Sequence, residues 1–215
     1  MPRRRDRDRK PARQTGTRTP KKRFLVLCEG KATEPEYLRC FTVWVRNPLV
    51  EVEIPDVQGD PLVLVDEAKA RRSEAIRRAR AEGDDNLLFN EVWCVTDVDE
   101  HKRLEPALDK AKGNDIRVAL SNPCFELWLL LHFRESPGAQ HRHELQRRVR
   151  NETGGSTKHV DFSKYESGYQ DAVRRAALLT KTALEDGEPR RNPTTTVYQL
   201  TVSIDSAARK ANEDE

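Results

Sequence analysis

The chain has 215 residues, of which 36% are hydrophobic and 35% are charged, and its formal net charge is only +3. This length is enough for one domain with a buried core, and no stretch approaches the roughly 20 apolar residues of a membrane-spanning helix, so we expect no such segment. The small net charge hides an asymmetry: residues 1–23 hold eleven Lys and Arg against two Asp, a net of +9, which leaves −6 for the rest of the chain.

Residues 1–22 are predicted to form a disordered basic arm, because they contain almost no apolar side chains that could offset the entropy of ordering. Their charge suits either a solubilising tail or an arm that contacts nucleic-acid phosphates. The segment lacks the apolar stretch of a secretory signal, and the four cysteines are widely spaced without a C-x-x-C pair. We therefore expect a reduced, cytoplasmic protein with no zinc ribbon and no membrane association.

Strand and helix patterns alternate from residue 23 onward. Continuous apolar runs bounded by turn residues predict strands buried on both faces, and alternation of apolar and polar residues predicts the strand over residues 49–57. Helical spacing of apolar residues predicts helices between the strands. The predicted strands are residues 23–28, 49–57, 91–97 and 115–120. The predicted helices are residues 33–45, 61–81, 101–112, 123–133, 142–150, 168–185 and a last one from 193 onward. This order predicts an α/β fold with a parallel sheet.

The predicted helix over residues 123–133 is apolar nearly all round, so we expect it to be buried, with Ser121 and Asn122 placed to cap its start. Glu126 is the only charged residue in PCFELWLLLHF and is a candidate site residue, because a buried carboxylate is costly unless it is paired or binds a metal. Stabilisation by the helix dipole explains Glu126 equally well. His132, near the end of this stretch, is expected to be a core histidine.

Two acidic motifs follow predicted buried strands, at the edge where parallel sheets bind ligands. Glu29 follows the first strand, and Asp97 and Asp99 follow the strand over residues 91–97. In an extended chain the two aspartates share a face, and close carboxylates favour a hard divalent cation such as Mg²⁺. Glu29 adds a third ligand if the two strands are neighbours. Solvated turn carboxylates are the alternative, and Glu34 has the position of an ordinary first-turn acid.

Four motifs carry a resemblance to known proteins: CEGKATEPEYLRCF, VTDVDEHKR, SNPCFELWLLLHF and NPTTTVYQL. A Glu-Gly turn after one strand and Asp-x-Asp after a later strand resemble the Toprim catalytic core of topoisomerases, primases and several nucleases. The whole motif series, over residues 23–205, resembles the RloB-like proteins, a Toprim-related bacterial family found with restriction and abortive-infection loci. The resemblance implies a Toprim-like parallel sheet flanked by helices over residues 23–135, with a mainly helical C-terminal extension, residues 136–215, packed on it.

The resemblance also implies roles for individual residues. Glu29 acts as a general acid or base, and Asp97 and Asp99 bind Mg²⁺ or Mn²⁺. Glu126 joins them in the candidate catalytic set on local grounds alone, as the one charge in a buried apolar stretch. Gly30 lets the backbone approach a phosphate. The candidate phosphate contacts are Lys31, His101, Lys102 and Arg103, all of types that are also common on solvated surfaces. The basic stretch HRHELQRRVR, residues 141–150, suits either a nucleic-acid contact or a solvated helix face.

The expected function is a Mg²⁺-dependent nuclease that cuts DNA or RNA as the effector of a bacterial anti-phage or abortive-infection system. The sequence has no Walker A motif, so ATP hydrolysis would come from a partner, and the resemblance implies an AAA-type ATPase in that role. Two alternatives stay open. One is a non-catalytic regulatory module that binds nucleic acid or a nucleotide, and the other is an enzyme of primase-like nucleotidyl transfer.

Overall fold

A five-stranded sheet in the order β2-β1-β3-β4-β5 forms the centre of the molecule. The computed structural model describes residues 21–57, 59–98, 103–155 and 160–213, with side chains up to residue 210. Strands β1 (Lys22–Cys28), β2 (Val50–Glu53), β3 (Glu91–Asp97) and β4 (Arg117–Asn122) are parallel, and β5 (Thr194–Thr195) runs antiparallel to β4. The fold is therefore α/β with a mostly parallel sheet, as the alternation of strand and helix patterns predicts.

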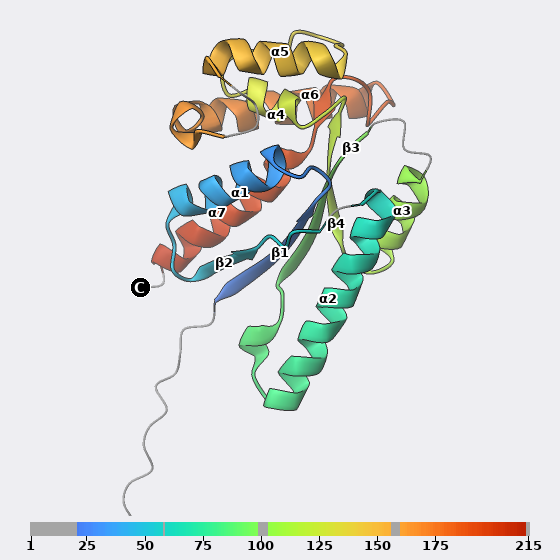
Figure 1. Cartoon of the computed structure of the whole chain (residues 1–215), viewed down its shortest axis with the longest axis vertical. Coiled ribbons are helices and arrows are strands. Elements are labelled where there is room, and N and C mark those ends of the chain that lie inside the picture. The colour runs from blue at the N-terminus through green and yellow to red at the C-terminus, as the bar shows by residue number, and fades with distance from the viewer. Residues whose placement is uncertain (1–20, 58, 99–102, 156–159, 214–215) are drawn as a thin grey trace, which may run out of the picture.

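Seven α-helices lie around the sheet in the described residues (Figure 1). In chain order they are α1 (Thr33–Val45), α2 (Pro61–Glu82), α3 (Leu104–Lys112), α4 (Glu126–Leu130), α5 (Arg142–Thr153), α6 (Tyr169–Glu185) and α7 (Val197–Glu213). Three short 3₁₀ turns join them: η1 (Asp85–Leu87), η2 (Phe162–Lys164) and η3 (Glu166–Gly168). Figure 1 shows α2 and α3 on one face of the sheet and α1 and α7 on the other, with α4, α5 and α6 beyond one end of the strands.

The central strands are buried on both faces, which is why their apolar runs are continuous. On one face, alternate residues of β1 such as Phe24 and Val26 pack with α1, α4, α5, α6 and α7 in the larger of two apolar clusters. On the other, Leu25 and Leu27 pack with α2 and α3 in the smaller cluster. The sheet therefore forms the middle layer of three, and the period-2 alternation of side chains divides each strand between two cores.

The segment after residue 135 contributes to the sheet and to the core. Its strand β5 pairs with the end of β4, where the Ser121 and Thr195 hydroxyls lie 2.9 Å apart. Leu145 and Val149 of α5 and Leu200 and Ile204 of α7 belong to the same apolar cluster as β1. Residues 136–213 thus share one hydrophobic core with the strands before them.

The expected cap of the buried apolar stretch is wrong. Ser121 lies in β4, which runs on to Asn122, and α4 begins only at Glu126 with Phe125 as its N-cap residue. The hydroxyl of Ser121 bonds to Thr195 because β5 offers it a cross-strand partner. Pairing with β5, which comes from a distant part of the chain, thus extends β4 into residues whose local sequence is typical of a helix start.

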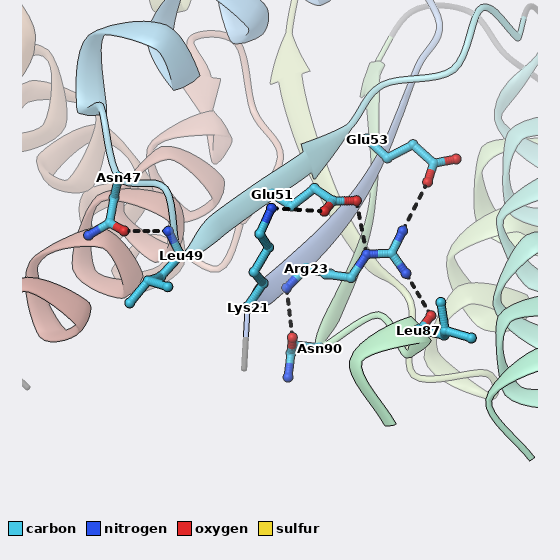
Figure 2. A network of polar contacts seen from close by, with 8 residues as sticks. All are labelled: Lys21, Arg23, Asn47, Leu49, Glu51, Glu53, Leu87 and Asn90. Atoms are coloured by element: carbon cyan, nitrogen blue, oxygen red, sulfur yellow. Dashed lines mark hydrogen bonds and ion pairs between the residues drawn. The ribbon is translucent and has the colours of Figure 1, made fainter. Parts of the chain in front are cut away.

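At the end of the sheet where β1 begins, Arg23 connects several segments of the chain (Figure 2). Its guanidinium donates to Glu51 of β2 at 3.0 Å and to the Leu87 carbonyl at 2.6 Å, and its backbone N–H donates to Asn90 at 2.7 Å. The same guanidinium lies over the ring of Phe89, 4.6 Å from the ring centre. One side chain thereby connects β2, β1 and the chain that enters β3.

An aromatic cluster joins α1 to the C-terminal helices, and a histidine lies within it. Tyr37 contacts the rings of Phe125, Trp128 and Phe162, and its hydroxyl lies 3.0 Å from Nε2 of His132. The other ring nitrogen, Nδ1, lies 3.0 Å from the Trp128 carbonyl. His132 is buried and both its nitrogens have partners, so the expectation of a core histidine is confirmed.

Burial lowers the pKa of His132 to about 4, and this makes part of the fold's stability sensitive to acid. The unfolded chain takes up the proton near pH 6.5 and the folded chain only near pH 4, so the stabilisation is complete above pH 6.5 and is lost as the pH falls toward 4. We expect His132→Gln to remove about 3 kcal/mol of the pH dependence of the free energy of unfolding across this window. Urea unfolding of the wild type and of His132→Gln at pH 7 and pH 4 measures this pH dependence. The prediction is contradicted if the free energy of unfolding changes by the same amount between the two pH values in both proteins.

Candidate functional site

The carboxyl ends of β1 and β3 bring Glu29 and Asp97 together. The strands are neighbours with Cys28 opposite Val95, and the backbone N–H of Glu29, the next residue, donates to the Val95 carbonyl at 3.0 Å. The Glu29 carboxylate accepts hydrogen bonds from the Thr96 hydroxyl and from the backbone N–H of Asp97, the latter at 3.3 Å. The two acids that the sequence places about 70 residues apart thus meet at one edge of the sheet.

Two further carboxylates face the same edge. Glu34 stands in the first turn of α1, directly after the loop that leaves β1. Glu126 is the first residue of α4 and is 8% exposed. Burial, together with the charge of the Glu126 carboxylate, raises the pKa of the Cys124 thiol. Glu34, which reads as an ordinary first-turn acid in the sequence, is thus part of an acidic cluster with Glu29, Asp97 and Glu126.

Burial and mutual repulsion disfavour the charged forms of two members of this cluster. Burial, together with the charges of Glu34, Glu126 and Glu29, raises the pKa of Asp97 to about 8. Burial, together with the charges of Glu126 and Glu29, raises the pKa of Glu34 to about 7. The cluster carries more negative charge than its surroundings compensate, which is the condition that a bound cation relieves.

Arg142 supplies positive charge to this cluster from the C-terminal segment. It is the first residue of α5, and its guanidinium donates to the Asp97 carboxylate at 3.1 Å. The arginine lowers the pKa of both Asp97 and Glu34, but burial and the neighbouring acids outweigh it. A residue of the segment after 135 therefore reaches an acid that the core strands provide.

Gly30 makes room for Glu34. A Cβ atom on Gly30 would overlap the carboxylate of Glu34, so the absence of a side chain there allows this acid to lie against the loop. The reason expected from the sequence was the approach of a phosphate. In the structure a carboxylate of the chain lies over this position.

Of the other candidate residues, the structure describes only Lys31 and Arg103. Lys31 is exposed and lines a cavity of about 160 Å³ together with Arg39 and Asp56. Arg103 forms an ion pair with Asp60, the N-cap residue of α2, so its charge is already shared. Asp99, His101 and Lys102 lie outside the described residues.

The donor chemistry of the cluster fits a hard divalent cation, because carboxylate oxygens are the ligands that Mg²⁺ and Mn²⁺ favour. Within the described ranges, no three or more His, Cys, Asp or Glu residues are already arranged to hold a metal ion. Glu29 and Asp97 would be two ligands, and Asp99 is the third one expected from the sequence. A cation bound to Asp97 would lie close to the Arg142 guanidinium, whose positive charge opposes it.

Comparison with protein families assigns the chain. The family model of the RloB-like proteins matches residues 24–204. The chain belongs to the RloB-like family. No significant match was found among curated proteins or among solved structures. The matched range runs from β1 into α7 and includes Glu29, Asp97, Glu126 and Arg142.

None of the helices in the described part of this RloB-like protein is both long enough and apolar enough to cross a membrane. All four cysteines are free thiols, and Cys28, Cys94 and Cys124 are buried. Burial raises the pKa of each of these three thiols, so they pack as small apolar side chains.

Sequence reasoning missed Glu34 and Arg142 as members of the site in this RloB-like protein. The acidic first turn of α1 has an ordinary helix-dipole explanation, which concealed the contact of Glu34 with Gly30. Arg142 begins a strongly basic stretch in which several residues look equivalent. A signal was present for Glu34, because Gly30 precedes it by four residues and marks a close approach. No local signal distinguishes Arg142.

The raised pKa of Asp97 predicts that this carboxylate weakens the fold at alkaline pH when no metal is bound. A carboxyl group whose folded pKa is raised stabilises below its unfolded pKa of about 4 and loses that contribution as the pH rises through about 8. We therefore expect Asp97→Asn to raise the free energy of unfolding at pH 8 by more than about 1 kcal/mol, and to change it little at pH 4.

Urea unfolding in the presence of a chelator measures this effect, with Asp109→Asn on the exposed side of α3 as the matched control. Destabilisation of Asp97→Asn at pH 8 would mean that the bond to Arg142 outweighs burial and repulsion.

Proposed function

We propose that this RloB-like protein is a Mg²⁺-dependent nuclease that hydrolyses phosphodiesters of DNA or RNA. The observation that carries the proposal is the acidic cluster of Glu29, Glu34, Asp97 and Glu126 at the carboxyl edge of a parallel sheet, with raised pKa values at Glu34 and Asp97. Ligands of open α/β sheets bind at this edge. Excess carboxylate there suits metal-assisted phosphodiester chemistry.

Each residue has a distinct task in this proposal. Asp97 and Asp99 hold the Mg²⁺ ion, which when bound neutralises negative charge on the reacting phosphate. Glu29 takes the proton of the attacking water as a general base, and its two donors, the Thr96 hydroxyl and the Asp97 N–H, hold its carboxylate in place. Glu34, with a pKa of about 7, is suited to exchange a proton with the leaving oxygen at neutral pH.

Glu126 acts through the charge that it adds to the cluster. It is the first residue of α4, and its charge raises the pKa of Asp97 and of Glu34. A substitution that removes this charge would make both acids easier to ionise. We therefore include Glu126 in the site as an acid whose negative charge favours the binding of a cation.

The wider setting follows from the family resemblance. We propose that the sheet is a Toprim-like core, supported by the order of Glu29 after β1 and Asp97 after the neighbouring β3. We also propose that the protein is a cytoplasmic effector of a bacterial anti-phage or abortive-infection system and works with an AAA-type ATPase. The four free cysteines fit a reducing compartment.

Cleavage of nucleic acid tests the proposal directly. Purified protein is incubated with single-stranded and duplex DNA and RNA and with Mg²⁺ or Mn²⁺, alone and with the neighbouring ATPase. Because the first variant removes two metal ligands and the second removes the general base, we expect Asp97→Ala/Asp99→Ala and Glu29→Gln each to lower the cleavage rate by about 100-fold or more. Asp109→Asn, an exposed acid on α3, should keep the wild-type rate.

Other results would favour the other two functions. Binding of nucleic acid or a nucleotide without any cleavage, together with cell protection by Asp97→Ala/Asp99→Ala, would favour a regulatory module. Products longer than the substrate when nucleotides are supplied would favour nucleotidyl transfer of the primase type. Both results contradict hydrolysis as the reaction.

The basic arm predicts a separate, salt-dependent contribution to binding. Because β1 begins at Lys22, a deletion of residues 1–20 spares the strand and removes eight Lys and Arg. Each phosphate contact adds about 0.7–0.9 to the slope of log affinity against log salt, so we expect the deletion to flatten the slope by several units. Titration with an oligonucleotide at several salt concentrations measures the slope. Mn²⁺ binding should stay unchanged, and an unaltered slope would make the arm a solubilising tail.

A further inference from the structure

We propose that Arg142 is a substrate-binding residue that exchanges the Asp97 carboxylate for a backbone phosphate of the nucleic acid when a divalent cation binds Asp97. The inference rests on the proposed function and extends it, because it assigns a phosphate contact to the segment after residue 135. The observation behind it is the 3.1 Å contact of the Arg142 guanidinium with Asp97.

The helix that carries Arg142 is firmly attached to the core. Leu145 and Val149, one and two turns further along α5, are 0% and 1% exposed and pack in the larger apolar cluster. His141 caps the helix by accepting a hydrogen bond from the backbone of His143. The backbone that carries Arg142 is therefore fixed, and Figure 1 shows α5 beyond the strand ends that carry the site.

Exposure differs across the ion pair. The Asp97 side chain is 13% exposed and that of Arg142 is 36% exposed. The aspartate is thus mostly buried, whereas about a third of the arginine side chain is exposed to solvent, where a polyanion can contact it.

The other arginines of α5 whose partners are known behave differently. Arg147 and Arg148 both pair with Glu144 of the same helix, at 2.8 and 3.1 Å. Arg142 instead forms an ion pair with Asp97, the acid that is proposed to bind the cation. A cation bound to Asp97 and the Arg142 guanidinium repel each other, so binding of the cation weakens the ion pair between Arg142 and Asp97.

A nucleic-acid phosphate offsets this repulsion. The guanidinium has a planar fork of donors that suits phosphate oxygens as well as a carboxylate. A divalent cation at Asp97 repels the guanidinium, and a substrate phosphate offers the guanidinium negative charge in place of the Asp97 carboxylate. The cation and the substrate therefore bind together more favourably than either binds alone.

Two binding measurements test the exchange without relying on turnover. Calorimetric titration with Mn²⁺ alone compares wild type, Arg142→Ala and Arg147→Ala, which removes the same charge from the same helix. Because Arg142→Ala removes the competitor for Asp97, we expect its Mn²⁺ affinity to rise severalfold. Arg147→Ala should leave the affinity unchanged.

Oligonucleotide affinity is then measured with Mn²⁺ in a Glu29→Gln background, which keeps Asp97 and Asp99 but lacks the proposed general base. Loss of one charge-assisted contact predicts about tenfold weaker binding by Arg142→Ala and a salt slope smaller by about 0.7–0.9. Arg142→Lys should keep the salt slope and recover part of the affinity, since lysine retains the charge without the fork.

Unchanged or weaker Mn²⁺ binding by a folded Arg142→Ala protein would overturn the exchange, and so would unchanged oligonucleotide affinity. Thermal unfolding of each variant shows whether it is folded. Failure of the proposed function looks different, because then neither the wild type nor Arg142→Ala binds Mn²⁺, and the assignment of Arg142 falls with it.

Discussion

The parallel pairing of β1 with β3 is the constraint on which the rest of the site depends. Its register sets Cys28 opposite Val95, so the next residue of each strand, Glu29 and Thr96, meet and the N–H of Asp97 reaches the Glu29 carboxylate. A shift of one residue would turn every side chain of the strand to the other face and exchange the two cores. The apolar side chains that fix the register, such as Phe24 and Val26, therefore also position the acids.

This arrangement brings several acids close together, so their negative charges repel one another, and the structure limits this repulsion in two ways. Burial and repulsion raise the pKa of Asp97 and of Glu34, so a proton can replace part of the charge, while Arg142 offers a cation from another part of the chain. The strands that lead to the acids and the helix α5 that carries the arginine share one hydrophobic core. The site is thus a joint product of the sheet and the C-terminal segment.

The sequence was sufficient for the features that depend on local patterns. Buried strands, the α/β class, the family and the convergence of Glu29 with Asp97 could be predicted, because continuous apolar runs and residues directly after strands have fixed geometric meaning. Ser121 shows where this fails: its helix-cap pattern lost to pairing with Thr195, which lies 74 residues away in the chain. Arg142 was equally out of reach, since nothing local distinguishes it from its basic neighbours.

The two edges of the sheet have a consequence for how copies of the chain meet. A strand edge with open N–H and C=O groups is a template for aggregation. At one edge, β5 covers the end of β4 with the Thr195 to Ser121 contact. At the other, β2 is only four residues long and carries Glu51 and Glu53, both paired with Arg23. Short, charged or covered edges make strand pairing between two copies of the chain unfavourable. The sheet is therefore protected from edge-to-edge aggregation at high protein concentration.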